Sequence, residues 1–169
     1  MRSSQKPVDH PVLRTRKNPV TIDPDLERLS ATVEDFCAWI AQLPERDLRA
    51  QDWGPPEVLA HLVYWHEWYL AQSVAVLAGR ALRLPSGRFA DMNAKAVKKF
   101  FNMRPVALTR RFRAVNRRLS RLTEAHDPRK IGFRIKEGSK RWRLSDLIPA
   151  AEAHIRNHLR ALKKASKNA

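Results

Sequence analysis

The chain has 169 residues, of which 33 are Lys or Arg and 17 are Asp or Glu, so its formal charge at pH 7 is +16. At about 150 residues per domain this length predicts one domain, and the single cysteine, Cys37, excludes an intrachain disulfide and a multi-cysteine zinc site. Residues 1–18 lack the apolar core of a secretory signal, and the most apolar stretch, residues 58–78, is interrupted by polar side chains. We therefore expect a cytoplasmic protein without a membrane span.

The first part of the chain is predicted to be a basic N-terminal arm followed by a helix. Residues 1–22 combine five Lys or Arg with three prolines, a composition typical of an extended, loosely packed segment. The helix begins at Asp23-Pro24, because Asp is a preferred N-cap and Pro is favoured in the first helical position. Apolar side chains then recur every three or four residues up to Leu43, and Pro44 ends the helix.

The middle of the chain is predicted to hold two more helices. The second covers about residues 55–78, and Gly79 is a typical stop residue. It is apolar nearly all round, so we expect it to lie centrally. After a loop, a third helix is predicted over residues 90–123, with a kink or break near residues 102–104 because Pro105 disfavours a helical residue before it.

The last part of the chain is predicted to form a hairpin and a fourth helix. Residues 131–144 place two short alternating segments around a polar middle, which indicates a small β-hairpin. A helix follows from an N-cap at Ser145 to about Lys164. Four helices with almost no strand signal predict an all-α fold, a four-helix bundle that covers residues 23–166.

Three of the six histidines form a candidate site. His154 and His158 are four residues apart, so they stack on one face of the last helix. Small or apolar residues at positions 147, 151, 161 and 165 share that face and indicate that it points inward. His61 lies on an apolar face of the second helix. Such a pair with a third histidine from a facing helix can hold a divalent metal with open positions, and neutral imidazole suits zinc, nickel or iron.

The same three histidines also fit a structural role, because a histidine on an apolar face is more often a hydrogen-bonded core residue than a ligand. His66 lies about 140° around the helix from His61, so these two do not share a site. A metal-bound histidine needs a partner for its other ring nitrogen. Glu57 and Glu152 are on the same two helices, but their spacing does not identify either as that partner.

Four segments, in order, resemble a known family. Residues 53–65, Trp-Gly-Pro-Pro-Glu-Val-Leu-Ala-His-Leu-Val-Tyr-Trp, are similar to the second-helix signature of DinB-like four-helix bundles. Their Ala-His-Leu-Val-x-Trp core is most similar to the ClbS/DfsB branch. The other segments are Met-Asn-Ala-Lys at residues 92–95, Trp142 before the last helix, and His-x-x-x-His at residues 154–158. The resemblance spans about residues 24–164.

The resemblance implies an up-down-down-up bundle with a pocket between its second and fourth helices. Many DinB-like relatives bind a metal through three histidines, here His61, His154 and His158, and carry out thiol-transferase or hydrolase-like reactions. The ClbS/DfsB branch implies instead a protective role against a DNA-damaging electrophile, whose strained ring is opened without a metal. DinB-like bundles often dimerise, so a homodimer is also expected.

His61 and His154 are the candidate catalytic residues for an unidentified small molecule. With a metal bound, the site would acidify a water or a thiol. Without one, a histidine would act as general base if its pKa lay near 7. Aromatic residues beside the histidines either wall the pocket or simply pack the core. The candidate substrate-pocket residues are Tyr64, Trp65, Trp68 and Asn93.

A strongly basic segment supports an alternative function. Residues 95–121 contain ten Lys or Arg and no acidic residue, whereas an ordinary solvated helix face mixes the two signs. The alternative is a basic bundle that binds nucleic acid non-specifically through phosphates, with structural histidines. The same charge also fits a basic substrate funnel, or compositional drift in a basic proteome. The candidate nucleic-acid face consists of Lys98, Lys99, Arg110, Arg111, Arg117 and Arg118.

Overall fold

The structure is a computed structural model that describes residues 23–48 and 53–167, so the predicted arm, residues 1–22, lies outside the described residues. The described part is mostly helical and has one small two-stranded sheet, which confirms the all-α class. Its elements in chain order are α1 (Pro24–Gln42), the 3-10 turn η1 (Glu45–Leu48), α2 (Pro55–Leu77), α3 (Phe89–Phe100), α4 (Pro105–Ala125), the 3-10 turn η2 (Pro128–Lys130), β1 (Gly132–Arg134), β2 (Arg141–Arg143) and α5 (Leu144–Lys167).

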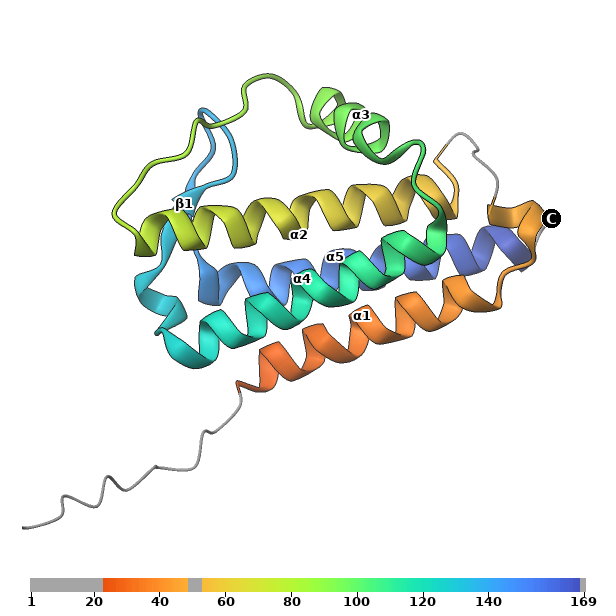
Figure 1. Cartoon of the computed structure of the whole chain (residues 1–169), viewed down its shortest axis with the longest axis horizontal. Coiled ribbons are helices and arrows are strands. Elements are labelled where there is room, and N and C mark those ends of the chain that lie inside the picture. Colours follow the sequence, from red (N-terminus) through yellow and green to blue (C-terminus); the bar gives the residue numbers. More distant parts are fainter. Residues whose placement is uncertain (1–22, 49–52, 168–169) are drawn as a thin grey trace, which may run out of the picture.

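Four long helices, α1, α2, α4 and α5, form a bundle. Figure 1 shows α1 and α5 running in one direction while α2 and α4 run in the other, so the order of directions along the chain is up, down, down, up. Helix α1 packs along α4 and α5, and α2 packs along α4. Helix α3 lies outside the four and packs on α2, while the β1–β2 hairpin covers another part of α2.

The predicted helix ends at residues 23 and 79 are confirmed. The side chain of Asp23 caps α1 by accepting a hydrogen bond from the backbone N–H of Asp25 at 2.9 Å. Helix α2 begins at Pro55 and ends at Leu77. Gly79 follows with a φ of 65°, a left-handed conformation that glycine adopts without the steric penalty of a Cβ atom.

The predicted third helix is two helices, so the described residues contain five α-helices rather than four. The break falls before Pro105, as expected, because a residue that precedes proline avoids the helical region. Arg104 accordingly has an extended backbone, with φ of −62° and ψ of 142°. The long helix of the bundle is therefore α4 alone, and α3 is free to lie across α2.

The hairpin prediction is confirmed, but the predicted N-cap of the last helix is wrong. Strand β1 pairs antiparallel with β2, with Phe133 opposite Trp142. Strand β2 continues directly into α5, which begins at Leu144. The backbone N–H of Leu144 still bonds to the carbonyl of Ile131 at 2.8 Å, so the sheet sets the start of the helix and Ser145 lies inside its first turn.

The core runs the length of the bundle, and α2 lies at its centre as predicted. Its buried residues cover most of its circumference, because α3, α4, α5 and the hairpin all contact it, but positions 71, 74, 77 and 78 toward its end are exposed. Phe36 of α1 and Phe112 of α4 are fully buried and meet edge to face at 6.4 Å, which is a favourable ring arrangement. Of the helices that the structure describes, none is both long and apolar enough to cross a membrane.

Candidate metal centre

The structure brings together the three histidines that the sequence singled out. His61 comes from the second turn of α2, and His154 and His158 come from successive turns of α5. The Nε2 atom of His154 lies 3.2 Å from that of His61 and 2.8 Å from that of His158. One ring nitrogen from each residue lies within 4.8 Å of the other two, so the three can reach one common point.

The cluster lies at the edge of the bundle interior. His61 is buried, with 3% of its surface exposed, whereas His154 and His158 are half-buried. The residues at positions 147 and 151, on the same face of α5, are buried as predicted, but those at 161 and 165 are exposed. The last turns of α5 extend past the start of α2 (Figure 1), which leaves that end of the face in solvent.

Burial and mutual proximity keep the three rings neutral. Burial, followed by the nearby rings of His154 and His158, lowers the pKa of His61 to about 3. Burial and the neighbouring His154 lower the pKa of His158 to about 4, and burial also lowers the pKa of His154. At pH 7 the rings of His61 and His158 are therefore neutral, and their pKa values lie well below the value near 7 that a general base would need, while the shift of the pKa of His154 is in the same direction.

Three neutral rings in this arrangement suit a metal ion. Each Nε2 carries either a proton or one lone pair, and a single lone pair on His154 cannot accept good hydrogen bonds from both neighbouring rings. A cation satisfies three converging lone pairs at once. In a tetrahedral site with metal–nitrogen bonds of about 2.0–2.1 Å, ligand nitrogens lie roughly 3.3 Å apart, which is close to the two short separations found here.

Asn93 lies against the buried ring of His61. Its side-chain oxygen accepts a hydrogen bond from Nε1 of Trp65 at 3.0 Å, which fixes the amide between α2 and α3. Its own hydrogen bond to His61 favours the protonated ring and so opposes the lowering of the pKa of His61. Nδ1 of His61 is buried without a well-aligned partner among the described residues, so Asn93 is the closest candidate to orient this ring.

The other proposed pocket residues have different surroundings. Trp65 is buried and packs against Tyr64 at 5.4 Å and Phe89 at 5.9 Å. Tyr64 is half-buried, and its ring lies 5.5 Å from the ammonium group of Lys99. Trp68 donates a hydrogen bond to the carbonyl of Ile135 at 3.0 Å, so it ties the hairpin to α2. Of the four, Asn93 interacts with His61, and Trp65 is linked to it through Asn93.

Trp53 is a site residue that the sequence analysis did not select. Its indole ring lies 5.3 Å from the ring of His61 and 6.2 Å from that of His158, and 42% of its surface is exposed. Its position just before Gly54-Pro55 marks the start of α2, but the periodicity of α2 does not include it. Trp53 is therefore a partly exposed ring that lies against two of the three histidines.

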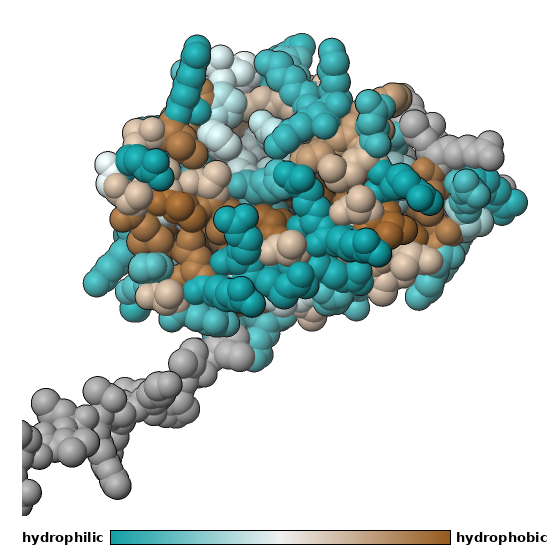
Figure 2. All heavy atoms as spheres, in the orientation of Figure 1, coloured by the Kyte–Doolittle hydropathy of each residue, from teal (hydrophilic) through white to brown (hydrophobic). Residues whose placement is uncertain are grey.

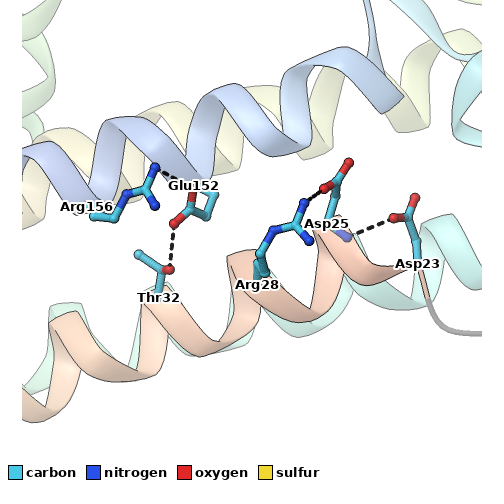
Figure 3. A network of polar contacts seen from close by, with 6 residues as sticks. All are labelled: Asp23, Asp25, Arg28, Thr32, Glu152 and Arg156. Atoms are coloured by element: carbon cyan, nitrogen blue, oxygen red, sulfur yellow. Dashed lines mark hydrogen bonds and ion pairs between the residues drawn. The ribbon is translucent and has the colours of Figure 1, made fainter.

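Two of the remaining candidates, Glu152 and His66, contact residues outside the cluster. Figure 3 shows Glu152 turned toward α1, where it accepts a hydrogen bond from Thr32 at 3.1 Å and pairs with Arg156 at 3.4 Å. Glu57 lines a groove with Val97 and Leu108. His66 is separate from the cluster, as predicted, and its ring meets Phe112 edge to face at 4.8 Å. Glu152, which is engaged by Thr32 and Arg156, therefore does not serve as the partner of a ring nitrogen in the cluster.

Comparisons with known proteins identified no relative of this chain. A scan against models of protein families, a search of curated proteins and a search of solved structures found no match to this chain. The geometry of the site therefore carries the functional argument.

The predicted nucleic-acid face divides into paired and unpaired residues. Lys99, at 3.3 Å, and Arg111 both form ion pairs with Glu67 of α2. The other four, Lys98 of α3 and three arginines of α4, are exposed and make no ion pair within the described ranges. The unpaired arginines are Arg110, Arg117 and Arg118.

Proposed function

We propose that this chain is a DinB-like metal-binding bundle in which His61, His154 and His158 hold one divalent ion, with zinc, nickel or iron as candidates. The convergence of three neutral ring nitrogens supports the proposal most directly. Three protein ligands leave at least one open position, which is typical of catalytic rather than structural sites. The proposed activity is hydrolase-like or thiol-transferase-like, on a small molecule.

The chain's own residues have distinct roles in such a site. A bound divalent metal supplies acidification of a water or thiol ligand at neutral pH. His61, His154 and His158 bind it with neutral rings, so metal does not have to displace protons at pH 7. Asn93 positions His61, and Trp53 restricts access of water from the solvent side.

A metal-free protective role, like that of the ClbS/DfsB branch, is the less favoured form of the proposal. It would need a histidine that takes a proton near pH 7, whereas the pKa values of His61 and His158 lie several units lower. The proposal includes a cytoplasmic location, which accords with a chain whose single cysteine, Cys37, leaves it without an intrachain disulfide. The homodimer expected from the resemblance is tested by light scattering on the purified protein.

Metal content of tag-free protein by mass spectrometry tests the proposal. We expect one equivalent of a transition metal in the wild type and in His126→Ala, an exposed histidine outside the cluster. His61→Ala and His158→Ala should each lose it while keeping a helical circular dichroism spectrum. Absence of metal from the wild type, even after reconstitution with zinc, nickel and iron in turn, would contradict the proposal.

A second candidate function, non-specific nucleic-acid binding, is favoured by the exposed, unpaired arginines of α4. Arg110, Arg117 and Arg118 lie on a helix whose first acidic residue is Glu124, close to its end. Binding through phosphates falls steeply with salt. Duplex DNA should bind at low salt, equally well in His61→Ala, and charge reversal at Arg117 should weaken it. Unchanged affinity in Arg117→Glu would rule out this face.

A further inference from the structure

Two neighbouring hollows lie between α2 and α4, and none of the three histidines lines either. One has a volume of about 500 Å³ and the other about 580 Å³. Leu70, Val74 and Arg118 line both, so the hollows form one groove with two depressions. Val115 of α4 lines the first depression and Leu122 of α4 lines the second.

The floor of this groove is apolar and open to solvent. Val74 and Leu77 of α2 are each 42% exposed, although they belong to the most apolar helix of the chain. Figure 2 shows this as hydrophobic surface over the end of α2 and toward α4, bordered by hydrophilic side chains. Exposed apolar side chains gathered in a hollow, rather than scattered singly, are typical of an interaction site.

The rim of the groove is positively charged. Arg80, Arg118 and Arg121 line it, and none of them makes an ion pair within the described residues. Glu67 is the one acidic residue among those that line the two hollows, and its charge is already balanced by Lys99 and Arg111. The surface thus combines an apolar floor with positive side chains that have no acidic partner among the described residues.

We propose that this groove binds an acidic amphipathic helix of a partner protein. Val115 and Leu122 are seven residues apart on α4, which is about 10.5 Å along a helix axis. Apolar side chains at positions i and i+7 of a bound helix have the same spacing and so reach both depressions. Acidic residues flanking them would meet Arg80, Arg118 and Arg121.

Charge and shape argue against four other occupants of the groove: a second copy of this chain, its own residues 1–22, a lipid bilayer and a nucleic acid. A second copy of this chain carries a charge of +16, and residues 1–22 carry five basic residues against one acidic residue, Asp9, so both would bring like charges to the rim. A bilayer contacts side chains that protrude, whereas these apolar side chains line depressions. Nucleic acid would meet the arginines but would leave Val74 and Leu77 without an apolar partner.

Binding of a labelled synthetic helix tests the proposal. The probe is a fluorescein-labelled peptide of about 18 residues, long enough for several helical turns, with Leu at i, i+3, i+4 and i+7 positions and Glu on the other faces. One control peptide replaces every Leu by Ala and keeps the charge, and another replaces every Glu by Lys. By fluorescence anisotropy we expect the first peptide to bind about tenfold or more tightly than the Ala peptide, and the Lys peptide not to bind.

Matched variants locate the binding. Val74→Asp and Arg118→Glu should each weaken binding of the Leu/Glu peptide about tenfold or more, whereas Arg160→Glu, an exposed arginine of α5, should not. The proposal would be overturned if the Leu/Glu peptide did not bind, or if it bound no more tightly than the Ala peptide. It would also be overturned if Val74→Asp bound the peptide as well as the wild type does, or if Arg118→Glu and Arg160→Glu had equal effects. Preferential capture by anionic phosphatidylglycerol vesicles, lost in Val74→Asp, would assign the groove to a membrane surface instead. Thermal unfolding confirms that each variant is folded, and metal content should be the same in all, since the groove lies apart from the histidines.

Discussion

The indole ring of Trp53 lies 5.3 Å from the imidazole ring of His61, with 59° between the two planes. The backbone of Trp53 has a φ of 61°, which is uncommon for any residue but glycine and costs on the order of 1–3 kcal/mol. Such strain persists where surrounding contacts hold it, and it clusters at functional sites. Here the strained residue carries a large ring that lies against His61 and His158.

Removal of the Trp53 side chain should open the metal centre. We expect Trp53→Ala to keep one metal equivalent, because its ligands remain, but to release the metal to a chelator several-fold faster, because the ring no longer shields it. Stopped-flow absorbance of a colorimetric chelator measures the rate. Phe101→Ala, another exposed aromatic residue but outside the cluster, is the control. Equal release rates in Trp53→Ala and the wild type would show that the ring does not guard the site.

Metal affinity should depend little on pH between 8 and 6. Three histidines with the ordinary pKa of about 6.5 would be mostly protonated at pH 6, which would weaken binding about 70-fold. Because the pKa values of His61 and His158 are about 3 and about 4, and that of His154 is also lowered, we expect a change of less than about fourfold, the effect of a single ordinary histidine. Competition with a zinc indicator at pH 8, 7 and 6 measures it. A loss near 70-fold would mean that the rings are protonated like exposed histidines.

Acid should destabilise the metal-free protein partly through His66. This ring is 2% exposed, and its burial lowers its pKa to about 4. The unfolded chain binds a proton near pH 6.5 while the folded protein does not, so the free energy of unfolding is constant above pH 6.5 and falls by about 3 kcal/mol as the pH drops to 4. Urea titrations at pH 8, 6 and 4 measure this.

The variant His66→Phe isolates that contribution. It keeps an aromatic ring against Phe112, so at pH 8 its stability should lie within about 1.5 kcal/mol of the wild type. Between pH 8 and 4 the free energy of unfolding of this variant should fall by less than that of the wild type, and the difference is the contribution of His66. The variant should still lose some stability, because His61 and His158 contribute with the same sign. Parallel losses in the two proteins would assign all of the acid sensitivity to other groups.

Cys37 should not react with thiol reagents in the folded protein. It is fully buried, and burial raises the pKa of its thiol to about 11, so almost no reactive thiolate forms at pH 8. An aromatic disulfide reagent should release no coloured thiol from native protein at pH 8 and one equivalent after unfolding in guanidinium. Rapid labelling of the native protein would show that Cys37 is accessible rather than buried.

The sequence predicted the helix ends and the histidine cluster because both follow from local rules. Capping by Asp23, the stop at Gly79 and the break before Pro105 depend on a few neighbouring residues, and the His154/His158 pair depends on helical spacing. The start of α5 was missed because a long-range backbone bond to Ile131 sets it. Trp53 was missed for a similar reason, since neither its left-handed backbone nor its contact with α5 shows in any periodic pattern.

The side chains around the site were also predictable where local spacing or a motif decides, and not where long-range packing decides. Asn93 came from a motif and lies beside His61, whereas Trp68 shared the apolar face of His61 but bonds to the hairpin instead. Faces of a helix are predictable from spacing, but the element that covers each face is a property of the whole fold. The orientation of Glu152 toward α1 is a further case.

The break before Pro105 separates α3 from the four helices of the bundle. The three histidines sit on α2 and α5, which belong to the four-helix bundle, whereas Asn93 sits on α3, a short helix laid on α2 from outside. A change in the sequence of α3 would alter what meets His61 while leaving all three histidines in place, because they lie on α2 and α5. In the proposed enzyme, substrate choice would therefore depend in part on one twelve-residue helix, whereas the proposed metal ligands lie on other helices.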